Sequence, residues 1–210
     1  MFNHNRGLWG YTGRASDGDL LTIQSTGMGG PSAAIVIAEL SELGARRMVR
    51  VGTCGALRAA LTLGEIIIVT EALAADGASR ALGAGDRVAP SQGLLAVLSR
   101  AAAGRARMGV VASTDLFYAA VEEGFRQAGA LAVEMETATL FAFAAREATV
   151  EAASALIVSD LLAGERVRID PEPLREAEHR LGQIALAALR CETPPEDDQV
   201  SSTKRAVAAE

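Results

Sequence analysis

The chain has 210 residues, 50% of them hydrophobic, and a formal net charge of -6 at pH 7. This length fits one large α/β domain. No apolar run approaches the roughly 18 residues that a membrane-spanning helix needs, and the first residues lack the features of a secretory signal, so we expect a cytoplasmic protein. The acidic balance argues against a broad nucleic-acid-binding surface but allows one small anion in an arginine pocket.

Cysteine and histidine are scarce in this chain. It contains Cys54 and Cys191 as its two cysteines, and His4 and His179 as its two histidines. These residues form neither a disulfide framework nor a spacing typical of a metal site. We therefore expect no metal ion and no bound cofactor.

Segments rich in β-branched residues alternate with alanine-rich segments of helical periodicity, which is typical of an α/β fold. The expected strands are 20–25, 48–53, 65–70, 107–113, 131–134 and 153–159. The expected helices are 31–43, 92–103, 136–147 and 171–189. We expect a single domain over 1–190, with a mixed, twisted sheet flanked by helices. The polar segment 191–210 is too poor in apolar residues to offset its ordering entropy and is expected to be a disordered tail.

A glycine-rich turn, Ser-Thr-Gly-Met-Gly-Gly-Pro-Ser over residues 25–32, leads from the first expected strand into the first expected helix. Glycines let a backbone approach a ligand closely, and a helix N-terminus attracts anions. Tight packing explains such a turn equally well. The turn matches neither a P-loop nor a dinucleotide-binding motif, which disfavours a dinucleotide-dependent oxidoreductase.

Arg50 lies inside an otherwise apolar strand. A buried guanidinium without a partner is costly, so Arg50 must pair either with an internal carboxylate or with a bound anion. Thr53 follows at the carboxyl end of the same strand, where ligands often bind in parallel sheets, and its hydroxyl could help to hold an oxyanion. Both partners for Arg50 remain open.

Acidic residues stand at two strand ends. Glu134 and Glu136 lie where a strand meets a helix, so they either cap the helix or accept hydrogen bonds from a vicinal diol such as a ribose. Ser159 and Asp160 end the last apolar strand, where Asp160 either caps a turn or protonates a leaving group. Phe117 follows another strand and belongs either to the core or to a ligand pocket.

These segments, together with Asn-Arg-Gly-Leu-Trp-Gly-Tyr-Thr-Gly over residues 5–13, resemble the nucleoside phosphorylase superfamily. The similarity is strongest to hexameric purine nucleoside phosphorylases and to methylthioadenosine phosphorylases, and it runs from Arg6 to about Leu189. The resemblance implies a three-layer fold and reversible cleavage of the N-glycosidic bond by phosphate, a pentosyltransferase reaction of purine salvage that needs no cofactor. It also implies a homohexamer built from dimers.

The resemblance implies roles for individual residues. Phosphate would be bound by Arg50 and Thr53, and by Arg6 reaching from a neighbouring subunit. The ribose would contact Glu136, Met135 and Met28. The base pocket would be formed by Phe117, Val133, Cys54, Gly55 and Ser159. Asp160 would protonate the purine at N7, assisted by Arg166 or Arg175. Phosphate would stabilise the oxocarbenium character of the sugar while Asp160 relieves charge on the departing base.

Three alternatives accompany this hypothesis. Uridine phosphorylases place Gln and Arg after the Phe-Tyr pair, where this chain has Ala-Ala-Val-Glu-Glu over 119–123, and they usually lack the equivalent of Asp160. Hydrolytic relatives tend to lack the arginine represented by Arg50. Phosphorolysis of purine nucleosides is therefore favoured over both. Family members usually begin with a further strand and a phosphate-binding loop that this sequence lacks, so a catalytically weakened, nucleoside-binding remnant is the third alternative.

Overall fold

The strands of the molecule form two separate sheets. The computed structural model describes residues 3–15, 18–117 and 122–190. A small antiparallel sheet pairs β1 (Gly10–Arg14) with β2 (Leu20–Gln24), and a larger mixed sheet has the order β5-β4-β6-β7-β3-β8-β9. The strands of the larger sheet are β3 (Arg47–Ala56), β4 (Ile66–Ala75), β5 (Arg87–Val88), β6 (Arg107–Thr114), β7 (Ala132–Glu134), β8 (Glu151–Leu161) and β9 (Val167–Arg168).

The larger sheet curls back on itself. Strand β8 runs parallel to β3 along its whole length, and the start of β4 pairs antiparallel with the middle of β8. Because β4 also pairs with β6, the strands β4, β6, β7, β3 and β8 are hydrogen-bonded in a closed succession. This arrangement gathers residues from strands that are distant in the sequence.

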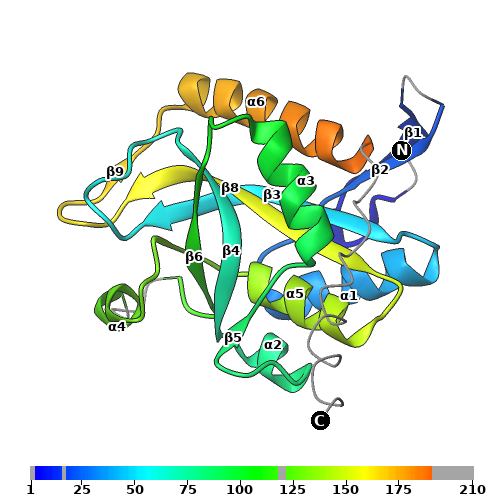
Figure 1. Cartoon of the computed structure of the whole chain (residues 1–210), viewed down its shortest axis with the longest axis horizontal. Coiled ribbons are helices and arrows are strands. Elements are labelled where there is room, and N and C mark those ends of the chain that lie inside the picture. Colours follow the sequence, from blue (N-terminus) through cyan, green and yellow to red (C-terminus); the bar gives the residue numbers. More distant parts are fainter. Residues whose placement is uncertain (1–2, 16–17, 118–121, 191–210) are drawn as a thin grey trace, which may run out of the picture.

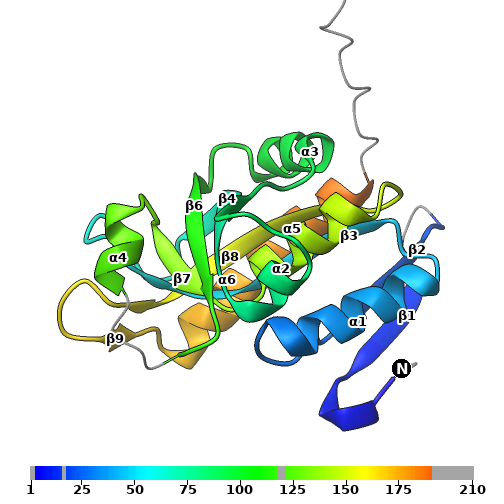
Figure 2. The same ribbon diagram turned by 90° about the horizontal axis from the view of Figure 1, so that it is seen from below.

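Helices cover the larger sheet on both faces, as Figures 1 and 2 show. The helices are α1 (Gly30–Glu42), α2 (Gly77–Ala81), α3 (Gln92–Ala102), α4 (Glu122–Gln127), α5 (Thr137–Arg146) and α6 (Pro171–Arg190), and a short 3-10 helix, η1 (Asn5–Gly7), precedes β1. Helices α1, α2 and α5 pack together on one face, and α3 and α6 pack together on the other. The expected three-layer α/β domain is confirmed.

Two apolar clusters fill the space between the layers. Ile67 and Leu156 pack in the cluster that contains Phe141 of α5, whereas their neighbours Ile68 and Ile157 pack in the cluster under α3 and α6. Successive side chains of a strand point to opposite faces. Strands β4 and β8 are therefore buried on both faces, which explains why their sequences are continuous apolar runs.

All six expected strands and all four expected helices are present, with ends within a few residues of those expected. Five further elements were not predicted from the sequence: β1, β5, β9, α2 and α4. Strands β5 and β9 are only two residues long, and α2 and α4 are shorter than two helical turns, so their periodicity carries little signal.

Tyr118 and the expected tail at 191–210 lie outside the described residues. In the described ranges, no helix combines the length and apolar character needed to cross a membrane.

Candidate active site

The strand register aligns residues from neighbouring strands at the centre of the candidate site. Val133 of β7 pairs with Gly55 of β3, and Gly55 pairs in turn with Asp160 of β8. Next to Val133, Glu134 pairs with Ser113 of β6. An irregularity between Cys54 and Gly55 shifts the β3–β8 register, so that Asp160 rather than Ser159 lies beside Gly55.

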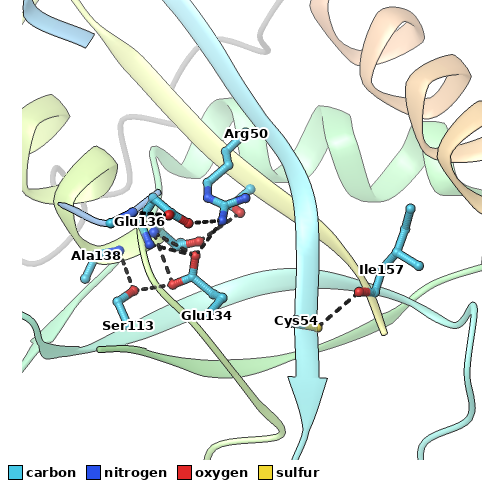
Figure 3. Close-up of polar contacts among 10 residues, drawn as sticks. Arg50, Cys54, Ser113, Glu134, Glu136, Ala138 and Ile157 are labelled. Carbon is cyan, nitrogen blue, oxygen red and sulfur yellow. Dashed lines mark hydrogen bonds and ion pairs between the residues drawn. The ribbon is translucent and has the colours of Figure 1, made fainter. Parts of the chain in front are cut away.

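Arg50 lies between two carboxylates (Figure 3). Its Nη2 atom is 3.0 Å from Oε2 of Glu134 and also contacts Oε2 of Glu136. The Glu134 side chain is 1% exposed and the Glu136 side chain 10% exposed, so both charges need this cation. A Cβ on Gly52 would approach Arg50 Nη1 to 2.0 Å, which shows that the guanidinium lies directly against the backbone of β3.

Glu134 caps helix α5. Its carboxylate accepts the backbone amide of Glu136 at 3.0 Å, that of Thr137 at 3.0 Å and the hydroxyl of Ser113. These amides have no partner within the helix, and the helix dipole favours a negative charge at this end. Glu136 is free of this capping role, and its Oε1 instead accepts the amide of Gly29 at 2.5 Å. Of the two roles considered for this pair of acidic residues, helix capping is the one that Glu134 has.

Asp160 is held by a second cation. Oδ1 of Asp160 accepts from Arg166 Nε at 2.9 Å and from Arg166 Nη2 at 2.7 Å, and the hydroxyl of Ser159 donates to Oδ2 at 2.8 Å. The Arg166 guanidinium also lies 5.2 Å from the centroid of the Phe117 ring, a cation–π contact. Asp160 is 7% exposed, whereas Phe117 is 58% exposed. Arg166 therefore connects a buried carboxylate with an exposed aromatic residue.

Cys54 lies between the two charged clusters. Burial raises the pKa of its thiol, and the negative charges of Glu134 and Asp160 raise this pKa further, against a lowering by Arg50. The thiol donates to the carbonyl of Ile157 at 3.5 Å. Gly55, the residue after Cys54, is paired with both Val133 and Asp160, so the strand register brings the Arg50 cluster and the Asp160 cluster to the same region of the sheet.

Comparison with known proteins identifies the family of the chain. The family model described as the phosphorylase superfamily matches residues 1–190. The chain belongs to the phosphorylase superfamily. It is 36% identical over 185 residues to a guanosine phosphorylase of Halorubrum lacusprofundi, covering 82% of this chain and 77% of that protein. It is 35% identical over 175 residues to a DeoD-type purine nucleoside phosphorylase of Caldanaerobacter subterraneus, covering 78% and 74%. A DeoD-type purine nucleoside phosphorylase of Jannaschia sp. is 34% identical over 195 residues, covering 89% and 82%.

The predicted family and the predicted class of enzyme are thus confirmed at the level of the superfamily. The relatives of the chain include proteins named purine nucleoside phosphorylase. The structure brings several predicted site residues together. Arg50 contacts Glu136, and Asp160 contacts Ser159. Cys54, Gly55 and Val133 lie between these pairs. Of the two arginines proposed to assist Asp160, Arg166 makes the contact, and Arg175 lies in α6.

Other predicted residues lie apart from these clusters. Arg6 is exposed in η1, with φ 56°, and Figure 2 shows η1 with β1 and β2 as an arm beyond α1. Thr53 is exposed, and strand alternation places its side chain on the face opposite Arg50. Met28 is 87% exposed and Met135 is half-buried.

Three predicted ambiguities now have a structural answer. Arg50 pairs with internal carboxylates, which is one of the two partners considered for it, and anion binding stays a prediction. Asp160 lies within β8 and caps no turn, and Phe117 is exposed rather than part of the core. Across the described part of the chain, no group of three or more His, Cys, Asp or Glu side chains could hold a metal ion.

Proposed function

We propose that the chain catalyses the reversible phosphorolysis of purine nucleosides, giving a free purine and a pentose 1-phosphate. The observation that carries this proposal is the arrangement of two ionic pairs around Cys54: Arg50 with Glu136, and Asp160 with Arg166. A cation, a carboxylate that caps no helix and a separate acid are the three groups that phosphorolysis needs for phosphate, sugar and base. The relatives named as guanosine and purine nucleoside phosphorylases support the same reaction.

The sugar and phosphate bind around Arg50 and Glu136 in this proposal. Glu136 accepts hydrogen bonds from the ribose hydroxyls, since its carboxylate is not used to cap α5. Arg50 and Thr53, both of β3, bind the phosphate in this proposal. Met135 and Met28 pack on the sugar. Phosphate then stabilises the oxocarbenium character that develops as the glycosidic bond breaks.

The base binds beside Asp160. Oδ1 of Asp160 is occupied by Arg166, so Oδ2, next to Ser159, is the oxygen that delivers a proton to N7 of the purine. The pocket is formed by Phe117, Val133, Cys54, Gly55 and Ser159. Protonation lets the base leave as a neutral molecule, and inorganic phosphate is the only co-reactant required.

We also propose that the active form is a homohexamer built from dimers, in which Arg6 contributes to the phosphate site of a neighbouring subunit. The arm that carries Arg6 exposes large apolar side chains: Trp9 is 54% exposed, Tyr11 52% and Ile23 65%. Tyr11 and Ile23 are cross-strand partners, so they form one continuous patch suited to an interface. A cytoplasmic location stays a prediction.

Release of free base from inosine and adenosine by the purified chain, with and without phosphate, tests the proposed reaction. Phosphate-dependent release with formation of ribose 1-phosphate is the expected result. Release that is indifferent to phosphate would indicate a nucleosidase, and release from uridine in preference would indicate a uridine phosphorylase. Tight nucleoside binding without release under any condition would contradict an enzymatic role.

A further inference from the structure

Arg126 of α4 connects the ends of two strands that carry the candidate site. Its Nε donates to the carbonyl of Leu57, directly after β3, at 3.0 Å. Its Nη2 donates to the carbonyl of Leu162, directly after β8, at 3.2 Å. The guanidinium also pairs with Glu123 at 3.3 Å, and the Arg126 side chain is 26% exposed.

The side chain of Arg58 also anchors α4, through hydrogen bonds to backbone carbonyls. Nη2 of Arg58 donates to the carbonyl of Arg126 at 2.5 Å, and Nε of Arg58 donates to the carbonyl of Ala130, before β7, at 3.0 Å. Helix α4 has only six residues, too few to be stable by itself. The two arginines therefore tie α4 to the ends of β3 and β8 and to the start of β7.

The segment that Arg126 holds leads directly to the acid of the site. Leu162 lies against the site, because a Cβ on Gly55 would approach Leu162 Cδ1 to 2.5 Å. Four residues after Leu162 comes Arg166, whose guanidinium donates two hydrogen bonds to Asp160. After Arg166 the chain returns to the sheet, where Arg168 of β9 is the antiparallel strand partner of Asp160 of β8. Arg166 therefore lies in a loop that is fixed at one end by the pairing of β8 with β9 and at the other end by the contacts of Leu162.

We infer that Arg126 is a positioning residue for the Arg166–Asp160 pair and, through it, for protonation of the departing base; this inference rests on the proposed function. Without Arg126, the Leu162 carbonyl loses its side-chain donor, whereas the Leu162 amide still donates a hydrogen bond to the Ala56 carbonyl at 2.8 Å. A displacement of about 1 Å at a catalytic group can lower turnover on the order of 100-fold. Arg126 makes its contacts with Leu57, Leu162 and Glu123, so it acts on the Arg166–Asp160 pair indirectly.

The test compares guanosine with 7-methylguanosine. The methylated base already carries a positive charge at N7, so it leaves as a neutral molecule without receiving a proton. In Arg126→Met we expect kcat for guanosine to fall about tenfold, part of the usual contribution of a general acid, while kcat for 7-methylguanosine stays within about twofold. Equal losses with both nucleosides, or no loss with guanosine, would overturn the inference.

Arg46→Met is the matched control. Nη1 of Arg46 also donates to two backbone carbonyls, those of Ser41 and Ala45, at 2.8 and 3.1 Å, but at the opposite end of β3. This variant should change kcat for neither nucleoside. If Arg126→Met does not fold, Arg126→Lys serves in its place, because it keeps the charge but presents a single donor centre. The same difference between the two nucleosides is expected.

Amide hydrogen exchange gives a readout that needs no catalysis. The amides of 162–166 should exchange faster in Arg126→Met than in the unaltered chain, and no faster in Arg46→Met. Unchanged exchange would overturn the inference whatever the activity. An unaltered chain that releases no base would instead refute the proposed function, and faster exchange would then still support the tie between Arg126 and the loop.

Discussion

Arg50 and Glu136 neutralise each other across the candidate site. The guanidinium of Arg50 contacts one oxygen of the Glu136 carboxylate, and the other oxygen accepts the amide of Gly29 at 2.5 Å. The cation proposed for phosphate and the carboxylate proposed for ribose are thus held together before either substrate binds. Each substrate must share its partner with an internal contact, which makes the two binding steps interdependent.

Glu136→Gln should change the two substrate affinities in opposite directions. The amide keeps the shape of the carboxylate but loses its charge, so the ribose hydroxyls lose a charged acceptor and the KM for nucleoside should rise about tenfold or more. Arg50 is released from one of its two carboxylates, so the KM for phosphate should fall. Steady-state kinetics with each substrate varied in turn measures both effects. Glu42→Gln, at the exposed end of α1, is the control, and a rise in both KM values would contradict the prediction.

Asp160→Asn should retain nucleoside binding and lose turnover. Asparagine fills the same space but has no acidic proton for N7, so we expect kcat to fall about 100-fold with the KM for inosine within about threefold. Initial rates of hypoxanthine release at saturating phosphate measure this change. Asp86→Asn alters an exposed carboxylate of comparable size and should have no effect. Unchanged turnover in Asp160→Asn would remove Asp160 from the acid role.

Cys54 should make the folded state less stable at alkaline pH. Burial, with Glu134 and Asp160, raises the pKa of its thiol, so the folded chain keeps a proton that the unfolded chain loses above about pH 8.5. The contribution of Cys54 is therefore complete below that pH and should decrease by about 1.4 kcal/mol per pH unit above it.

Urea unfolding of the unaltered chain and of Cys54→Ala at pH 7.5, 9 and 10 measures this contribution. Other titrating groups are common to both proteins, so the difference between their free energies of unfolding isolates the thiol. This difference should change in favour of Cys54→Ala as the pH rises. A constant difference would show that the thiol ionises equally in both states.

Gly30→Ala should destabilise the turn that supports Glu136. A Cβ at Gly30 would lie 2.6 Å from Oγ1 of Thr139 and 2.8 Å from Oδ2 of Asp76, two buried groups that are hydrogen-bonded to each other. Such overpacking costs about 1–3 kcal/mol of unfolding free energy. Movement of the neighbouring Gly29 amide away from Glu136 should also raise the KM for nucleoside.

Gly85→Ala is the control for this substitution. A Cβ at Gly85 would meet nothing within 4 Å, and the residue does not have a positive φ. Its free energy of unfolding should stay within about 0.5 kcal/mol of that of the unaltered chain. Equal effects of the two alanines in thermal unfolding would show that Gly30 is not tightly packed.

Much of the site could be anticipated because its residues conflict with their surroundings. An arginine in an apolar strand must have a partner, and acidic residues at the ends of buried strands must be capped, paired or functional, so Arg50, Glu136 and Asp160 were identifiable from the sequence. The sequence did not distinguish Glu134 from Glu136, because both precede the same helix. Only the register of β7 against β6 brings Glu134 to Ser113 and gives it the capping role.

The sequence by itself determined the order and type of the main elements, since hydrophobic period and glycine positions are local properties. It also determined which residues carry charge into the interior. The tertiary structure alone decided that Arg166 rather than Arg175 holds Asp160, and that Arg126 ties the ends of β3 and β8. Arg126 binds the backbone carbonyls of Leu57 and Leu162. Every residue has such a carbonyl, so no side-chain pattern marks the acceptors, and only the folded chain brings them within reach.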